Sequence, residues 1–358
     1  MQFQTAVVED GVQPHSHVQP QVRELRVQFT GTAQEYFRIW IVNTLLTIVT
    51  LGVYSAWAKV RTKQYFYRNT VLDGTSFEYL ANPIQVLKGR LIAAAALAAL
   101  FGSQYYSPVL YGVVVLLLLL ASPWVFVKAL AFNARNSAFR NIRFAFAGRV
   151  GEAAGLYFGM MLLHVFTCGL AYPYVQWRLT SFAVWRHYYG DQQFTWVSKS
   201  GDYYRAYLLA LAMTLPAYLV LFGVIAAAAD PGNPGAMSSL MVPLTVFIYA
   251  YLLIPGAFLR AKLSNLLYGG TRIGQHELAC DQRGVDVLKL YAVNALAIVV
   301  SLGLLIPWAK IRLAQYRASR LTLLAFGSLS AAKLLDDQTN AVGEGLSDLG
   351  DFDVGIGV

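Results

Sequence analysis

The stretch Thr50-Leu-Gly-Val-Tyr-Ser-Ala-Trp-Ala-Lys-Val-Arg61 is repeated near the other end of the chain as Ser301-Leu-Gly-Leu-Leu-Ile-Pro-Trp-Ala-Lys-Ile-Arg312. In each copy an asparagine, Asn43 or Asn294, precedes the glycine by nine positions. The tryptophan, lysine and arginine follow that glycine by five, seven and nine positions. Matching residues at matching spacing predict a duplicated architecture.

A third copy, weaker than the other two, lies in the middle of the chain. It retains Gly169, Tyr174, Gln176 and Arg178, but Met160 takes the place of the asparagine. We therefore expect internal repeats at about residues 35–83, 151–200 and 285–325.

The composition is that of a membrane protein. Hydrophobic residues make up 57% of the 358 residues and charged residues only 13%, about half of the charge of a soluble globular protein. Seven runs approach the roughly 20 apolar residues that cross a bilayer. They are Ile39–Ala58, Leu91–Tyr106, Val109–Val127, Ala153–Val175, Tyr207–Ala229, Ala236–Phe258 and Val287–Ala309.

The distribution of positive charge argues against seven simple crossings. Lys and Arg favour the cytoplasmic loops of membrane proteins. Strict alternation leaves either 16 or 12 of the 28 Lys and Arg residues outside. No basic residue lies outside if 39–58, 153–175 and 287–309 re-enter the bilayer and return, and the other four runs form two spanning hairpins. Gly52, Gly169 and Gly303 permit the necessary turns.

We therefore expect an all-α polytopic membrane protein, a helical bundle with internal repeats, four full spans and three re-entrant or half-inserted segments. Seven full transmembrane helices are the alternative. The membrane domain is expected over residues 27–334. A disordered N-terminal tail (1–26) and an acidic disordered C-terminal tail (335–358) flank it.

An aromatic residue followed four positions later by a cation recurs where apolar runs end. One helical turn separates the two, so the ring can lie at headgroup level while the cation reaches water. Such residues can be membrane anchors, or they can form a cytoplasmic ring that binds anionic lipid headgroups. The candidate ring comprises Trp57, Lys59, Arg61, Trp124, Lys128, Tyr174, Arg178, Trp308, Lys310 and Arg312.

Three polar side chains lie inside the apolar segments that are expected to re-enter. Asn43 and Asn294 can pair across the repeat. They serve either interhelical packing or a polar constriction that contacts a substrate. His164 is a packing residue, a ligand or a proton relay.

Short polar elements follow several of the apolar runs. Phe77-Glu-Tyr79, Phe144-Ala-Phe146 and Phe194-Thr-Trp196 each alternate an aromatic residue with one intervening residue. This pattern is typical of a short strand or an interfacial loop.

The residues around the first repeat resemble the YjgN-like family of bacterial inner-membrane proteins. The resemblance rests on Phe29-Thr-Gly31, Glu35-Tyr-Phe37, the stretch 50–61, Tyr65-Phe66, Asn69-Thr70 and Leu72-Asp-Gly74. Leu302-Gly303, Pro307-Trp-Ala-Lys-Ile-Arg312 and Tyr316-Arg317 match the family's closing segment. The resemblance implies a multi-pass protein of the bacterial inner membrane. It identifies no catalytic or binding residues, because the family's function is unknown.

The chemistry-bearing motifs point away from an enzyme. The sequence has no phosphate-binding Gly-x-x-x-x-Gly-Lys-Ser/Thr run, no HExxH and no nucleophile elbow, so we expect no catalytic residues, cofactor or metal. The basic residues lie between apolar runs, which excludes a nucleic-acid binder.

We expect a transporter or channel for a small solute or lipid. The alternative is a non-transporting scaffold that binds anionic lipids or partner proteins through a basic cytoplasmic face. The expected partners of the protein are the lipid bilayer and an unknown small solute, and association into a homo-oligomer is left open. Both termini are expected in the cytoplasm.

Overall fold

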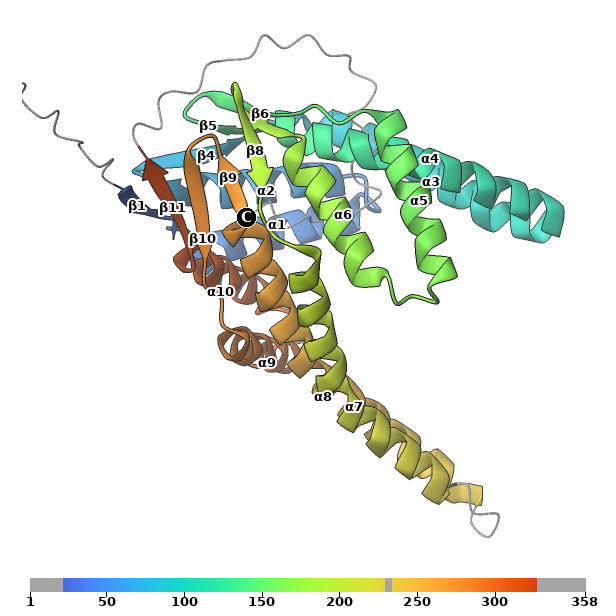
Figure 1. Cartoon of the computed structure of the whole chain (residues 1–358). Coiled ribbons are helices and arrows are strands. Elements are labelled where there is room, and N and C mark those ends of the chain that lie inside the picture. The colour runs from blue at the N-terminus through green and yellow to red at the C-terminus, as the bar shows by residue number, and fades with distance from the viewer. Residues whose placement is uncertain (1–21, 229–233, 327–358) are drawn as a thin grey trace, which may run out of the picture.

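Helix hairpins and short strands alternate along the chain in a computed structural model that describes residues 22–228 and 234–326. The helices pair in order as α1 (Ala33–Val49) with α2 (Ser55–Arg68), α3 (Pro83–Tyr106) with α4 (Pro108–Arg135), α5 (Val150–Phe166) with α6 (Tyr172–Trp185), α7 (Ser200–Ala228) with α8 (Pro234–Gly269), and α9 (Gly284–Val300) with α10 (Ile306–Ser319). Both ends of each hairpin connect to strands (Figure 1).

The strands all belong to one antiparallel sheet. They are β1 (Val22–Arg26), β2 (Gln28–Phe29), β3 (Thr70–Leu72), β4 (Thr75–Tyr79), β5 (Ser137–Phe139), β6 (Ile142–Phe146), β7 (His187–Tyr189), β8 (Gln192–Trp196), β9 (Thr271–Ile273), β10 (His276–Cys280) and β11 (Leu321–Phe326). In the sheet, β1 pairs with β11, and from β11 the strands follow one another in descending number to β2. Because only Val27 separates β1 from β2, the sheet curls until it is nearly a closed barrel.

The expectation of an all-α fold is therefore wrong. Eleven strands form a sheet that no helical bundle contains. The three aromatic alternations form the ends of strands β4, β6 and β8. The strands that pair with these three, namely β3, β5, β7 and β9, are only three residues long. Three residues are too few for a period-two pattern to be recognised. The sheet also pairs segments separated by whole helix hairpins, such as β8 with β9.

The three segments expected to turn back at a glycine each consist of two helices. Leu51, Cys168 and Leu302 have positive φ, and the following glycines have φ of +91°, +86° and +91°. The amides of Gly52, Gly169 and Gly303 donate to carbonyls five residues back, at 2.8, 2.9 and 2.8 Å. This is the hydrogen bond of a Schellman helix end. The same turn closes all three hairpins, as the repeat predicts.

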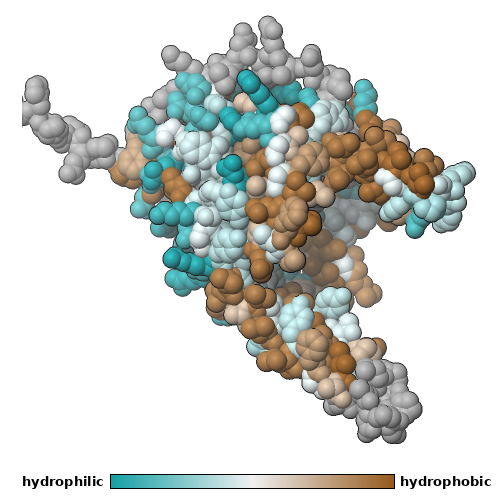
Figure 2. All heavy atoms as spheres, turned by 45° about the vertical axis from the view of Figure 1, so that its right-hand side comes forward, coloured by the Kyte–Doolittle hydropathy of each residue, from teal (hydrophilic) through white to brown (hydrophobic). Residues whose placement is uncertain are grey.

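Four helices within the described residues are long and apolar enough to cross a membrane, namely α3, α4, α7 and α8. They correspond to the four runs expected to span. Seven spanning helices do not fit, because segments 39–58, 153–175 and 287–309 are each broken by a turn. On the face drawn in Figure 2, hydrophobic residues cover the projecting hairpins and hydrophilic residues gather around the sheet.

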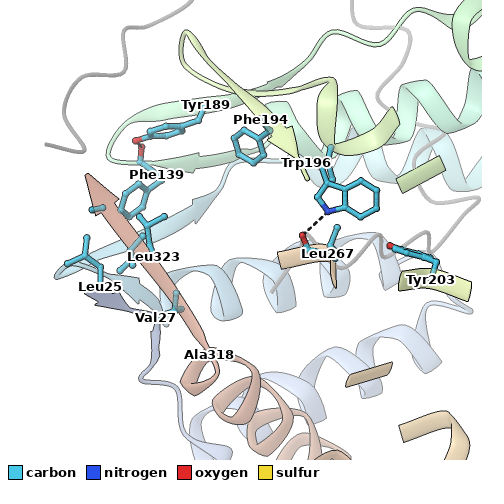
Figure 3. Packing of buried hydrophobic residues seen from close by; sticks show 13 residues of the cluster. Leu25, Val27, Phe139, Tyr189, Phe194, Trp196, Tyr203, Leu267, Ala318 and Leu323 are labelled. Carbon is cyan, nitrogen blue, oxygen red and sulfur yellow. Dashed lines mark hydrogen bonds between the residues drawn. The ribbon is translucent and has the colours of Figure 1, made fainter. Parts of the chain in front are cut away.

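Aromatic and aliphatic side chains fill the inside of the curled sheet (Figure 3). Phe139 stacks on Phe77 with ring centroids 4.7 Å apart and contacts Tyr189 at 6.2 Å. The hydroxyl of Tyr189 donates to the carbonyl of Phe139 at 3.1 Å. The sheet thus encloses a packed core at the place where the helix hairpins converge.

The expected tails lie mostly outside the described residues. Residues 1–21 and 327–358 are not described, which covers the acidic segment 335–358. Residues 22–26 form β1, inside the range that the sequence assigned to the N-terminal tail.

Candidate functional site

The first and last helix hairpins share a pair of contacts at their starts, and the equivalent residues of the two hairpins lie 251 positions apart in the chain. The amide of Thr32 donates to the hydroxyl of Tyr65 at 2.9 Å, and that of Arg283 donates to the hydroxyl of Tyr316 at 3.0 Å. Each tyrosine donates back to the carbonyl of the same residue, at 3.1 and 3.3 Å. The duplication seen in the sequence is therefore a duplication of contacts.

The two asparagines of the repeat hold equivalent positions, but they do not pair with each other by a hydrogen bond. Nδ2 of Asn43 donates to the carbonyl of Ala58 at 3.4 Å, and Nδ2 of Asn294 donates to the carbonyl of Ala309 at 3.2 Å. Both side chains are buried. Each amide thus joins the two helices of its own hairpin.

The arginines nine positions after the turn glycines are held differently in the two copies. Arg312 donates to Oδ1 of Asn294 at 3.2 Å and lies 4.5 Å from the centre of the Trp308 ring. Arg61 donates instead to the hydroxyl of Tyr54 at 3.0 Å. Oδ1 of Asn43 is buried and has no hydrogen-bond partner among the described residues. Both guanidinium groups are nonetheless occupied within their own hairpins.

The middle hairpin lacks both of these arginine partners. Met160 stands where the asparagine would be, and Ala171 occupies the position of Tyr54. Arg178 is exposed and has no hydrogen-bond or ion-pair partner in the part of the chain that the structure describes. The degenerate copy of the repeat therefore leaves its arginine available for an external group.

Arg178 lines a groove between α5, α6 and β8. The groove has a volume of about 810 Å³, within the range of small-molecule sites. Trp177 and Trp196 form part of its lining and stack with ring centroids 6.4 Å apart. Nε1 of Trp177 donates to the carbonyl of Ser198 at 2.8 Å, and Nε1 of Trp196 donates to the carbonyl of Leu266 at 3.1 Å. The segment after β8 and the helix α8 thereby fix the aromatic part of the groove.

The α5 wall of the groove is open because glycines face it. Gly151 and Gly155 line the groove, and a Cβ atom on either would meet nothing within 4 Å. Glu152 also lines it and forms an ion pair with Arg186. Because this pair neutralises one arginine, Arg178 supplies the groove's uncompensated positive charge.

The other residues of the expected cytoplasmic ring do not line this groove. Trp57 lies on α2 and stacks on Tyr54 with ring centroids 6.2 Å apart. Trp124 and Lys128 lie on α4, and Lys310 is exposed on α10. Tyr174 contacts Trp177 with ring centroids 5.6 Å apart. The aromatic–cation pairs are thus distributed over the second helices of four hairpins. Only the pair on α6 adjoins the groove.

His164 lies near the turn of the middle hairpin and does not line the groove. Its ring contacts Tyr172 at 5.8 Å, and its buried Nδ1 has no partner among the described residues. This single unpaired atom does not make a site. In residues 22–228 and 234–326, no three His, Cys, Asp or Glu side chains gather where they could hold a metal ion.

Sequence reasoning missed Trp177, Trp196, Glu152 and Arg186 as groove residues. Gly151, Gly155 and Gly159 recur every four positions on α5, and this spacing was the available signal for an open helix face. The contribution of β8 had no such signal, because it depends on how the sheet pairs.

The sheet core contains a buried histidine, His187 on β7, directly after the groove residue Arg186. Nδ1 of His187 lies 2.6 Å from the carbonyl oxygen of Ala183, and the ring contacts Phe146 at 5.0 Å and Phe194 at 6.2 Å. Burial among these groups lowers the pKa of His187 below its ordinary value of 6.5. This histidine packs between Phe146 of β6 and Phe194 of β8 and does not line the groove.

Comparison with known proteins gives a family but no activity. The family described as "Bacterial protein of unknown function (DUF898)" matches residues 24–349. The chain is 31% identical over 140 residues to the inner membrane protein YjgN of Salmonella typhimurium, covering 38% of this chain and 34% of that protein. It is 34% identical over 119 residues to the protein of the same name from Escherichia coli K12, covering 33% and 30%. The alignments thus span about a third of these relatives, and no solved structure matches the chain.

Proposed function

We propose a transport function for this chain, which belongs to the DUF898 family of bacterial proteins and so confirms the resemblance to YjgN-like proteins. It is a multi-pass inner-membrane protein, as the names of its relatives and its four long apolar helices indicate. The substrate that the groove fits best is a lipid or lipid-like amphiphile taken from the bilayer. A small solute taken from water is less well supported, because the groove lies on a membrane hairpin.

The continuous sheet supports insertion of all five helix hairpins from one side. Strands before and after every hairpin are hydrogen-bonded members of the same sheet. One sheet cannot lie on both sides of a bilayer, because open strands in hydrocarbon would leave backbone groups unpaired. The turns of the two long hairpins, at positions 102–108 and 229–235 of the sequence, contain no Lys or Arg. We therefore place the sheet in the cytoplasm, in agreement with the positive-inside rule.

The depth of the short hairpins supports re-entry into one leaflet. Nine positions separate Gly52 from Arg61, whereas twenty separate Pro108 from Lys128. At 1.5 Å per helical residue, these correspond to about 14 and about 30 Å. The longer distance matches the hydrocarbon core, and the shorter distance matches about half of it. With their cations at one interface, α3–α4 crosses the bilayer and α1–α2 stops near its centre.

The observation that carries the transport proposal is the position of the groove. It is formed by α5 and α6, and this short hairpin packs against α4 on one side and α7 on the other. Both neighbours belong to hairpins long enough to span. A lipid in the groove therefore lies between the two long hairpins, α3–α4 and α7–α8, which connect the leaflets. The α5–α6 hairpin between them stops short of the far leaflet.

Transport is tested with the full chain in liposomes that contain a trace of fluorescent phosphatidylglycerol on both leaflets. An impermeant reductant bleaches only the outer label, so about half of the fluorescence survives in empty liposomes. We expect less to survive with the protein present, and more to survive again with Gly155→Leu. Survival equal to that in empty liposomes contradicts the proposal.

The scaffold function is the second candidate, and the packed sheet favours it. Phe139, Tyr189 and Phe194 are buried inside the sheet, so its centre offers no evident passage for a solute. A scaffold requires only the surface of the protein. In the liposome assay a scaffold leaves the same fraction of fluorescence as empty liposomes do. That result would make the scaffold function the better description.

A further inference from the structure

We propose that Arg178 binds the phosphate of an anionic phospholipid whose head group occupies the groove of the middle hairpin. This deepens the proposed transport function by naming the class of lipid, and it rests on the same groove. The inference comes from comparing one position in three copies of a repeat. Arg61 and Arg312 have partners in their own hairpins, whereas Arg178 has none in the described residues and lines the groove.

The depth of Arg178 suits a lipid phosphate. Nine positions separate it from Gly169 at the turn, the same number that separates Arg61 from Gly52. With the turn near the centre of the bilayer, the guanidinium lies about 14 Å away along the helix, near the edge of the hydrocarbon core. Phosphates of the contacting leaflet lie at this level. An arginine presents planar, paired donors that match phosphate oxygens.

The rest of the groove suits a head group larger than phosphate alone. A volume of about 810 Å³ extends from Met160 and Arg178 toward Gln193 and Ser198 at the sheet. Ser181 also lines the groove and offers a hydroxyl. The Trp177 and Trp196 rings supply amphipathic faces near these polar groups. A lipid with a polar head group beyond its phosphate fills more of this space than a free anion does.

The charge balance favours an anionic lipid over a zwitterionic one. Glu152, the carboxylate of the groove, is paired with Arg186. A zwitterionic head group brings its own cation, and the groove presents no unpaired carboxylate among its lining residues to receive it. An anionic head group leaves the charge of Arg178 balanced without that cost.

A simple anchoring role makes a different prediction from specific binding. As membrane anchors, Arg61 and Arg178 are equivalent, because both follow a turn glycine by nine positions. As a binding residue, only Arg178 affects lipid selectivity. Arg61→Gln is therefore the matched control for Arg178→Gln. Both side chains are exposed, so neither change creates a cavity in the core.

The experiment measures binding of acyl-labelled phosphatidylglycerol and phosphatidylcholine to the purified full chain in detergent, by fluorescence anisotropy. We expect wild-type protein to prefer phosphatidylglycerol. Loss of a charge-assisted hydrogen bond predicts about a tenfold weaker affinity for phosphatidylglycerol in Arg178→Gln. Affinity for phosphatidylcholine is expected to fall by a smaller factor, so that the preference for phosphatidylglycerol shrinks, and Arg61→Gln is expected to bind like wild type.

Two further arms test the groove and the source of the phosphate. Gly155→Leu adds a side chain to the open wall and is expected to weaken binding of both lipids. Inorganic phosphate and glycerol 3-phosphate are added as competitors, and millimolar amounts are expected to leave the bound lipid in place. Displacement by either at micromolar concentration overturns the assignment in favour of a free anion.

The remaining outcomes separate this inference from the transport proposal. Equal affinity for both lipids, or equal losses in Arg61→Gln and Arg178→Gln, overturns the inference. So does unchanged binding in Gly155→Leu. Transport without Arg178-dependent selectivity rejects the phosphate site and retains the transport function. Arg178-dependent binding without transport rejects the transport function and retains the site.

Discussion

Arg312 donates a hydrogen bond to Oδ1 of Asn294 at 3.2 Å, a contact that the first copy of the repeat lacks. In that copy Arg61 donates to Tyr54, and Oδ1 of Asn43 has no partner in the described part of the chain. The position of Tyr54 is occupied by Leu305 in the last hairpin, which has no hydroxyl. One substitution thus accounts for the different arginine partners in two otherwise matching hairpins.

This difference predicts unequal costs for removing the two asparagines. Asn294→Ala removes bonds to both Ala309 and Arg312, whereas Asn43→Ala removes only the bond to Ala58. We expect Asn294→Ala to lower the free energy of unfolding by about 1 kcal/mol more than Asn43→Ala. Chemical unfolding in a mild detergent measures both. An equal or larger loss in Asn43→Ala contradicts the different roles.

The packed sheet predicts a large effect for a core aromatic residue. Phe139 is buried against Phe77 and Tyr189. Phe139→Ala leaves a cavity and is expected to cost about 3–5 kcal/mol of unfolding free energy. Val197→Ala, at an exposed residue just beyond β8, is the control and is expected to cost under about 1 kcal/mol. A small loss in Phe139→Ala contradicts a packed interior.

The buried histidine of β7 predicts a loss of stability in acid. Burial lowers the pKa of His187 in the folded chain below 6.5, so the unfolded chain binds more protons as the pH falls below 6.5. Unfolding is thereby favoured, and the stabilisation is fully present only above that pH. His276 on β10 also has a lowered pKa through burial, so it acts in the same direction.

The histidine prediction is checked by unfolding the detergent-purified chain at pH 7.5 and pH 5.5. The wild type is expected to lose stability at the lower pH. His187→Gln is expected to lose less between the two values, with His276 responsible for part of the remainder. An unchanged pH dependence in His187→Gln contradicts the assignment.

The apolar tips of the short hairpins predict sensitivity to charge. Leu51 and Leu302 occupy left-handed backbone at the tips, and each is 94% exposed within the protein. If these tips lie in hydrocarbon, Leu51→Asp costs up to about 3 kcal/mol of insertion free energy. We expect less of the variant in the membrane fraction of cells, and Leu51→Ala is the control. Equal amounts of both variants contradict an immersed tip.

The sequence predicted the helical part of the fold because each helix carries its own signal. Gly52, Gly169 and Gly303 marked turns that the structure contains. The four long runs became helices long enough to span. The sheet lacked a comparable signal, because strands such as Thr70–Leu72 are too short for a pattern and pair across helix hairpins.

The candidate site was predicted only in part, for a similar reason. Arg178 was recognised from the repeat, but its lack of a partner follows from Met160 and Ala171 together and needs a structure to be seen. Trp196 joins the groove through the pairing of β8, which is not written in local sequence. The pairing of Asn43 with Asn294 was wrong as a hydrogen bond, since each binds within its own hairpin.

The central claim, that every hairpin enters from the side of the sheet, is tested most directly by cysteine labelling in intact cells. Single cysteines replace Ser76 on β4, Ser198 after β8 and Tyr106 at the end of α3, after Cys168 and Cys280 are changed to serine. An impermeant thiol reagent is expected to label only Tyr106→Cys, and the other two only after the membrane is opened. Labelling of Ser76→Cys or Ser198→Cys in intact cells would contradict the one-sided sheet and the re-entrant hairpins.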